Sequence, residues 1–147
     1  MLSFTGSARV GWHLKSKAAG KVVLELGGNA GVIVCKDAQL GWAAQRCVLG
    51  GFNYAGQICI KVQRIVVERE VYPAFLEKLV AGARAAPTGD PALAQTVVGP
   101  VIDDAAADRI QAWIAEAVAA GAQCAAGGER KGRSAGSGWF MKIASSV

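Results

Sequence analysis

The chain has 147 residues, of which 52% are hydrophobic and 18% are charged. With this composition the chain is neither a disordered protein nor a solvated tail. A chain of this length allows one folded domain with a modest core. The formal charge of +5 comes from scattered residues with one basic cluster, Glu129-Arg-Lys-Gly-Arg133, so we expect no nucleic-acid partner.

Two further classes of protein are excluded by simple counts. The sequence contains no uncharged apolar run of about eighteen residues, and its start lacks the pattern of a secretory signal, so we expect a cytoplasmic protein with no membrane contact. Its four cysteines, at positions 35, 47, 59 and 124, form no C-x-x-C pair, and His13 is the single histidine. Because this spacing does not suit zinc, we expect no metal site and four reduced thiols.

The first thirty residues predict a strand, a helix and a second strand. Leu2–Thr5 is a short strand candidate, and Ser7 is a plausible N-cap for a helix that Gly20 closes. The β-branched run Lys21–Glu25 suits a buried parallel strand. This order places the carboxyl ends of the strands and the helix N-terminus at one edge, where α/β sheets usually bind ligands.

Glycines at this edge are compatible with a phosphate site. The spacing Gly6-Ser-Ala-Arg-Val-Gly11 differs from the dinucleotide fingerprint G-x-G-x-x-G, and it lacks the Lys-Ser/Thr of a P-loop. A helix N-terminus can bind a phosphate group. The alternative is a helix-entry turn with a glycine required for packing.

A second α/β unit follows. Gly31–Cys35 is an apolar strand candidate in which Cys35 packs as a small hydrophobe. Asp37 is a reasonable N-cap for a helix over 38–49, with Cys47 on a face that can be buried and Gly50-Gly51 as its end.

The remaining chain continues in the same pattern. Cys59 lies in a loop or at a helix start, and it precedes a strand over Gln63–Glu68 and a helix from Val71 through Arg84. Another amphipathic helix is predicted over 105–120, and a short strand is possible over 122–126. The expected apolar side of that helix consists of Ile110, Trp113, Ile114 and Val118.

Two segments carry residues capable of covalent catalysis. Lys21-Val-Val-Leu-Glu-Leu-Gly-Gly-Asn29 contains a carboxylate, Glu25, and Phe52-Asn-Tyr-Ala-Gly-Gln-Ile-Cys-Ile60 contains a thiol, Cys59. A carboxylate that takes a proton and a thiol that attacks carbon are the reagents of acyl transfer through a thioester. The alternatives are a core cysteine and a carboxylate that only caps a neighbouring helix or meets a lysine.

Together with Phe4-Thr-Gly-Ser7, these segments closely resemble the aldehyde dehydrogenase superfamily, in the family's order and roughly its spacing, from Ser3 to about Phe140. The resemblance implies an α/β fold of three layers, with a mostly parallel sheet and flanking helices. It also implies three parts: 1–28 from the end of a Rossmann-like cofactor domain, 29–140 from the catalytic domain, and a divergent tail over 141–147.

The same resemblance implies roles for individual residues. The cysteine of the matching Gly-Gln-x-Cys motif, here Cys59, attacks the aldehyde, and the glutamate of Glu-Leu-Gly-Gly, here Glu25, is the base for deacylation. Gly6, Ser7 and Gly11 fall in the pyrophosphate region, and Leu26 and Gly27 fall on the nicotinamide side of an NAD or NADP site. Ala8 departs from the family, where a threonine is common.

Members of this family are several times longer than this chain, so the resemblance implies a truncated central piece with little or no full activity. Two other functions stay open: a thiol esterase that needs only a reactive Cys59, and a non-catalytic interaction module. We expect a small-molecule aldehyde as substrate. We also expect a homo-oligomer, because incomplete sheets expose edges and apolar faces.

Overall fold

The computed structural model describes residues 1–128; the basic cluster at 129–133 and the predicted tail over 141–147 lie outside them. Strands and helices alternate along most of this length, and both strand pairs are parallel, which confirms the predicted α/β class. In chain order the elements are β1 (Leu2–Thr5), α1 (Ala8–Lys17), β2 (Val22–Glu25), β3 (Ala30–Val34), α2 (Leu40–Phe52), the 3-10 helix η1 (Asn53–Gly56), β4 (Val62–Val67), α3 (Tyr72–Ala85) and α4 (Asp104–Ala119).

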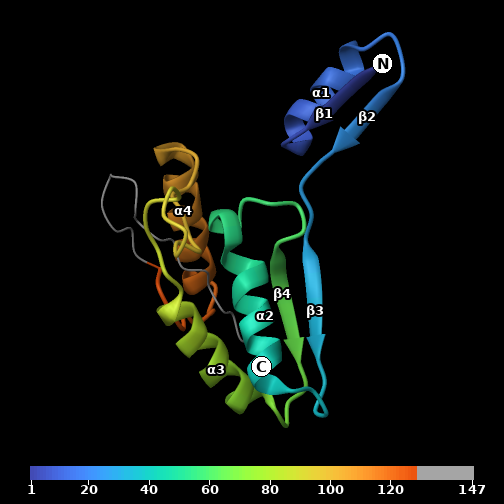
Figure 1. Ribbon diagram of the computed structural model, residues 1–147. Coiled ribbons are helices and arrows are strands. Elements are labelled where there is room, and N and C mark those ends of the chain that lie inside the picture. The colour runs from blue at the N-terminus through green and yellow to red at the C-terminus, as the bar shows by residue number, and fades with distance from the viewer. Residues whose placement is uncertain (129–147) are drawn as a thin grey trace.

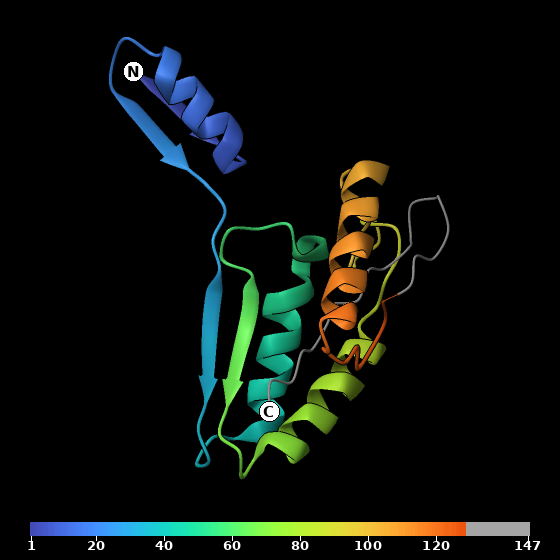
Figure 2. The ribbon, with the colours of Figure 1, turned by 180° about the vertical axis from the view of Figure 1, so that it is seen from behind.

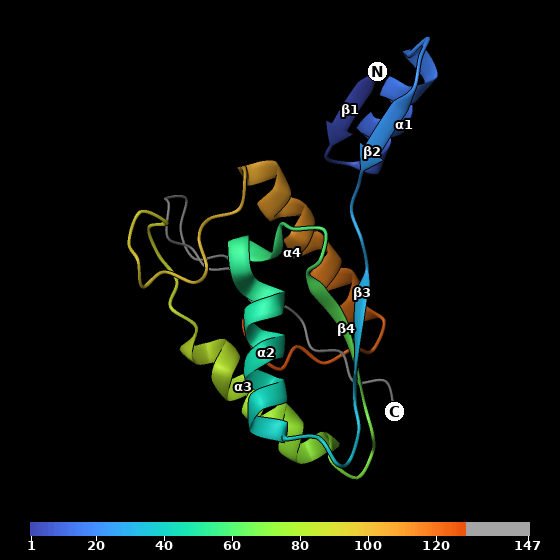
Figure 3. The ribbon, with the colours of Figure 1, turned by 45° about the vertical axis from the view of Figure 1, so that its right-hand side comes forward.

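The first unit is the predicted β-α-β arrangement. β1 pairs with β2 in parallel from Leu2 opposite Val22 to Thr5 opposite Glu25. Ser7 is the N-cap of α1, and its hydroxyl accepts a hydrogen bond from the backbone N–H of Val10 at 3.4 Å. Figures 1, 2 and 3 show this unit standing apart from the rest of the chain, to which a short segment after β2 connects it.

Two details of this unit differ from expectation. α1 ends at Lys17 rather than at Gly20, because Ala18 already has an extended backbone. β2 is only half-buried, and Val23 keeps 39% of its surface exposed, since a helix covers one face of the strand pair.

The second unit is built around α2. β3 pairs with β4 in parallel, and α2 connects them as the crossover helix. Figures 1 and 2 show α2 between this strand pair and α3, and it contacts both. The main core lies at these contacts and consists of Val34, Ala44, Cys47, Val48, Phe52, Phe75, Leu79, Ala83 and Val98.

The ends of α2 were predicted wrongly. The helix begins after Gln39 rather than after Asp37, and it continues through Gly50-Gly51 to Phe52. Gly50 does not end the helix but lets α2 pack closely against β4, because a Cβ at this position would lie 2.8 Å from a methyl group of Val62 on β4. Cys35 was also predicted wrongly, since β3 stops at Val34 and leaves Cys35 exposed.

α3 follows its prediction closely, with Pro73 in its first turn. α4 has the predicted extent, with Asp103 as N-cap, but its apolar face was partly wrong. Its buried residues are Ala106 and Ala107, whereas Trp113 is 60% exposed with the Arg109 guanidinium 5.6 Å from its ring centre. Residues 122–126 form no strand.

Candidate functional site

Cys59 lies in a turn between η1 and β4, and its side chain is exposed. It is therefore neither a core cysteine nor a residue at a helix start. The backbone leading to it has an unusual shape: Tyr54, Ala55 and Gly56 have φ values of 54°, 55° and 70°. Non-glycine residues rarely adopt this left-handed conformation, and two in succession are rarer still.

The segment that follows Glu25 approaches the turn around Cys59, which we call the cysteine turn, at Gly28. A Cβ built on Gly28 would lie 2.6 Å from the backbone carbonyl oxygen of Cys59, which only a glycine avoids. The side-chain amide of Gln63 donates a hydrogen bond to the carbonyl oxygen of Gly28 at 3.0 Å. The two predicted motifs, which are about thirty residues apart in the sequence, thus contact each other in the fold.

Glu25 is the last residue of β2, and its side chain is exposed. Its backbone carbonyl accepts a hydrogen bond from the N–H of Gly6 at 3.0 Å. Two residues, Leu26 and Gly27, separate it from Gly28, so the Cα atoms of Glu25 and Gly28 lie at most about 11 Å apart. Among the hydrogen bonds within residues 1–128, none joins the side chains of Glu25 and Cys59 directly.

The residues assigned to cofactor binding gather at the carboxyl ends of β1 and β2. Gly6 and Ser7 are exposed at the N-terminus of α1, whose first turn contains no acidic residue. Gly11 is buried, and a Cβ on it would lie 2.7 Å from a methyl carbon of Leu26, so this glycine allows α1 to pack close to the chain that leaves β2. Gly27 is exposed, with open space around it.

Two residues of this site were not predicted from the sequence. Gln57 and Gln63 both use their side-chain amides to hold the backbone around Cys59. The available signal was the place of Gln57 inside the Gly-Gln-x-Cys motif, whereas Gln63 at the start of a strand carried none.

The other thiols have different surroundings. Cys47 is buried, and burial raises the pKa of its thiol. Cys35 and Cys124 are exposed, like Cys59. Near Cys59, burial lowers the pKa of the half-buried Lys61 amine, which lies against Gly56.

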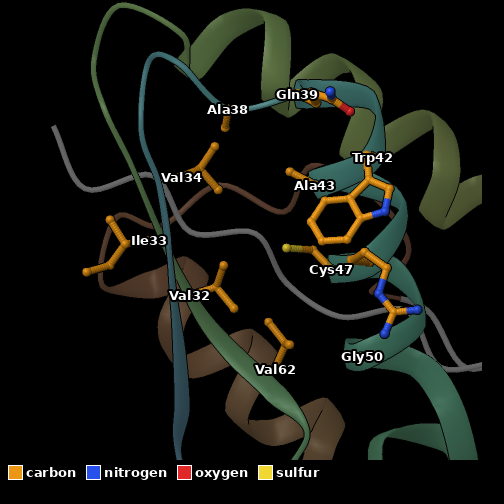
Figure 4. Close-up of a pocket in the computed structure, with 11 residues that line it drawn as sticks. Val32, Ile33, Val34, Ala38, Gln39, Trp42, Ala43, Cys47, Gly50 and Val62 are labelled. Carbon is orange, nitrogen blue, oxygen red and sulfur yellow. The ribbon is translucent and has the colours of Figure 1, made fainter.

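A separate pocket of about 740 Å³ lies between β3 and α2 (Figure 4). Its lining is largely apolar, and it includes Val32, Trp42 and Cys47, with Arg46 as its charged member. Neither Cys59 nor Glu25 lines it, so it is distinct from the candidate site.

Within residues 1–128, no group of three His, Cys, Asp or Glu side chains is arranged to hold a metal ion. In the same part of the chain, no helix has both the length and the apolar character needed to cross a membrane.

Comparison with known proteins decides the family. The model of the aldehyde dehydrogenase family matches residues 1–144. The chain belongs to the aldehyde dehydrogenase family. This confirms the resemblance inferred from the Glu25 and Cys59 motifs.

Curated relatives agree with this assignment. The chain is 47% identical over 133 residues to a 3-sulfolactaldehyde dehydrogenase of Priestia aryabhattai and 40% identical over 138 residues to a vanillin dehydrogenase of Corynebacterium glutamicum. Each alignment covers 90% of this chain and 28% of the relative. The chain thus spans little more than a quarter of the length of these aldehyde dehydrogenases.

Solved aldehyde dehydrogenase structures contain the same fold. An NAD-dependent aldehyde dehydrogenase from Sinorhizobium meliloti matches 99% of this chain, using 30% of its own, with 34% identity and a TM-score of 0.90. A betaine aldehyde dehydrogenase from Staphylococcus aureus, solved in complex with NAD+, matches 90% of this chain, using 27% of its own, with 34% identity and a TM-score of 0.83.

Proposed function

We propose that this chain supplies the nucleophile and the base for NAD(P)-dependent oxidation of an aldehyde, with Cys59 as nucleophile and Glu25 as base. The observation that carries the proposal is the contact of Gly28 with the backbone of Cys59. It brings an exposed thiol and the segment that follows an exposed carboxylate to the same place in the fold. These are the two groups that thioester chemistry requires.

The reaction begins when the Cys59 thiolate attacks the aldehyde carbon, which forms a C–S bond and leaves negative charge on oxygen as a thiohemiacetal. Oxidation of this carbon to a thioester needs a hydride acceptor, which a bound nicotinamide cofactor would supply. Glu25 then takes a proton from water, and the hydroxide attacks the thioester carbon. The C–S bond breaks, the acid leaves, and the thiolate is restored.

The residues at the ends of β1 and β2 fit the cofactor. Gly6 and Ser7 place the exposed N-terminus of α1 at a strand end, and its first-turn N–H groups favour an anion such as a pyrophosphate. Arg9 in the same turn adds positive charge. Leu26 and Gly27 precede Gly28, which contacts Cys59, and the nicotinamide would sit beside them. Gly11 lets α1 approach Leu26.

This assignment divides the chain at the segment after β2. Residues 1–28 would belong to a cofactor-binding domain and 29–140 to a catalytic domain, with a sequence over 141–147 that diverges from the family. The way β1, α1 and β2 stand apart supports the first boundary (Figure 3). NAD is the cofactor named for the Sinorhizobium meliloti structure, and either NAD or NADP suits the residues of this chain.

The test uses an activated phenyl ester, which acylates a nucleophilic thiol without any cofactor. We expect the ester to acylate Cys59, as located by peptide mass spectrometry, and Cys59→Ser to lose this label while Cys35→Ser, which also alters an exposed thiol, keeps it. Glu25→Gln should slow release of the acyl group about a hundredfold, whereas Glu116→Gln on the exposed side of α4 should not. Equal acylation of all exposed cysteines would overturn the proposal.

A further inference from the structure

The backbone before Cys59 is held in an unfavourable shape. Tyr54 and Ala55 are the two non-glycine residues with positive φ within residues 1–128, and Gly56 continues the left-handed turn. Left-handed conformations cost free energy for residues with a Cβ, so they persist only where other contacts hold them. We call residues 54–56 the left-handed turn.

The side chain of Gln57 supplies such contacts. Its Nε2 donates to the carbonyl oxygen of Tyr54 at 3.1 Å and to that of Pro100 at 3.5 Å. Its Oε1 accepts from the backbone N–H of Ile102 at 2.8 Å. One amide therefore ties the left-handed turn to a segment more than forty residues later, just before α4.

The turn around Cys59 is also limited by Gly28. A Cβ on Gly28 would meet the Cys59 carbonyl oxygen, so the turn has little room to move in that direction. Gln57 and Gly28 thus act on the residues before Cys59 and on Cys59 itself. The proposed reaction steps give Gln57 no role of its own.

We propose that Gln57 is a positioning residue: by bridging Tyr54 to Pro100 and Ile102, it holds the left-handed turn and thereby aims the Cys59 thiol. This inference rests on the proposed role of Cys59. It predicts that losing the bridge leaves the thiol exposed but no longer aligned, so that reactions requiring alignment slow more than reactions requiring only access.

The experiment compares two reactions of the same thiol. Acylation by the activated ester needs a well-placed attack and support for the developing oxyanion, whereas alkylation by iodoacetamide needs mainly an accessible thiolate. We expect Gln57→Leu to lower the ratio of acylation rate to alkylation rate at Cys59 about tenfold or more. Gln45→Leu, on the exposed side of α2, should leave the ratio unchanged.

Two further variants separate positioning from simple loss of structure. Gln57→Glu keeps the acceptor for Ile102 and loses the donors, so its ratio should lie between those of the parent and Gln57→Leu. Adding Ala55→Gly to Gln57→Leu should restore part of the ratio, because glycine adopts the left-handed conformation at no steric cost. Continued protection of the buried Cys47 from alkylation shows in each variant that the core is folded.

Hydrogen exchange tests the bridge independently of Cys59 chemistry. In Gln57→Leu the amide of Ile102 and those of 53–61 should exchange about tenfold faster or more. Unchanged hydrogen exchange in Gln57→Leu would overturn the inference. So would an unchanged ratio of acylation rate to alkylation rate in Gln57→Leu, provided that the ester acylates Cys59 in the parent. If exchange is faster in Gln57→Leu but the ester does not acylate Cys59 in the parent, the bridge made by Gln57 is supported and the proposed function is refuted.

Discussion

At the scale of single residues, Gly28 is the point where the two halves of the candidate site meet. Gly28 ends the Glu-Leu-Gly-Gly motif in the sequence, and the structure identifies what approaches it: the carbonyl oxygen of Cys59. The identity of the partner could not be predicted, because it depends on how β4 and its preceding turn dock against the segment after β2.

Gly28→Ala should therefore displace the cysteine turn. The added methyl would lie 2.6 Å from a backbone oxygen, which cannot rotate away, so we expect a loss of about 1–3 kcal/mol in the free energy of unfolding. Acylation of Cys59 by the activated ester should fall about tenfold. The control is Gly31→Ala, where a Cβ has open space; an equal effect of both variants would remove the special role of Gly28.

The buried thiol of Cys47 makes stability depend on alkaline pH. Burial raises its pKa above the ordinary 9.0, so above that pH the unfolded chain loses a proton that the folded chain keeps. The stabilising contribution is thus complete below pH 9.0 and is lost as the pH rises through the higher folded pKa. In urea unfolding, the stability advantage of the parent over Cys47→Ala should narrow as the pH rises above about 9.

The pKa of Lys61 is shifted in the opposite direction, and its effect on stability cancels when the parent is compared with Cys47→Ala. Burial lowers the pKa of its amine, so its contribution to stability grows as the pH rises, equally in the parent and in Cys47→Ala. An advantage that stays constant over the whole pH range would mean that Cys47 ionises no differently in the folded chain.

At the scale of elements, the sequence predicted the type and order of the helices and strands apart from the possible strand over 122–126, which does not form, whereas several boundaries were set by tertiary contacts. Period and capping residues located α1, α3 and α4, because their signals are local. The end of α2 was missed because Gly50-Gly51 reads as a terminator, whereas Gly50 is needed where the helix crosses Val62. The left-handed turn before Cys59 could not be predicted either, since Tyr54 and Ala55 are not residues that favour it.

Two glycines of α2 should respond in opposite directions to alanine. Gly50→Ala places a methyl 2.8 Å from the stiff side chain of Val62, and we expect it to destabilise the chain by about 1 kcal/mol after the gain in helix propensity. Gly41→Ala, in the first turn of the same helix, meets nothing within 4 Å and should stabilise by about 0.5 kcal/mol. Urea unfolding measures both changes, and stabilisation by Gly50→Ala would contradict the packing described for α2 and β4.

At the scale of the whole molecule, apolar side chains lie exposed beside the strand pair and the pocket of Figure 4. Ile33, Trp42 and Val66 keep 75%, 64% and 62% of their surfaces exposed, and β3 and β4 offer unpaired edges within residues 1–128. Such surfaces favour association with another chain.

We therefore expect self-association at micromolar concentration in sedimentation velocity. Ile33→Lys combined with Trp42→Glu should shift the chain toward monomer, because each change places a charge where an apolar contact would form. Trp113→Glu on α4, which is similarly exposed, serves as the control. A parent chain that sediments only as monomer would contradict this expectation.

The proposed function depends on Cys59 being a nucleophile placed beside a cofactor site. Its most direct test is the rate at which an electrophile labels each cysteine in the parent and in Cys59→Ser, with and without NAD, over a pH series. We predict that Cys59 reacts faster than Cys35 and Cys124, which are also exposed, and that NAD changes the rate of Cys59 alone. Similar rates for all three exposed thiols, unaffected by NAD, would mean that Cys59 is not an activated nucleophile beside a cofactor site.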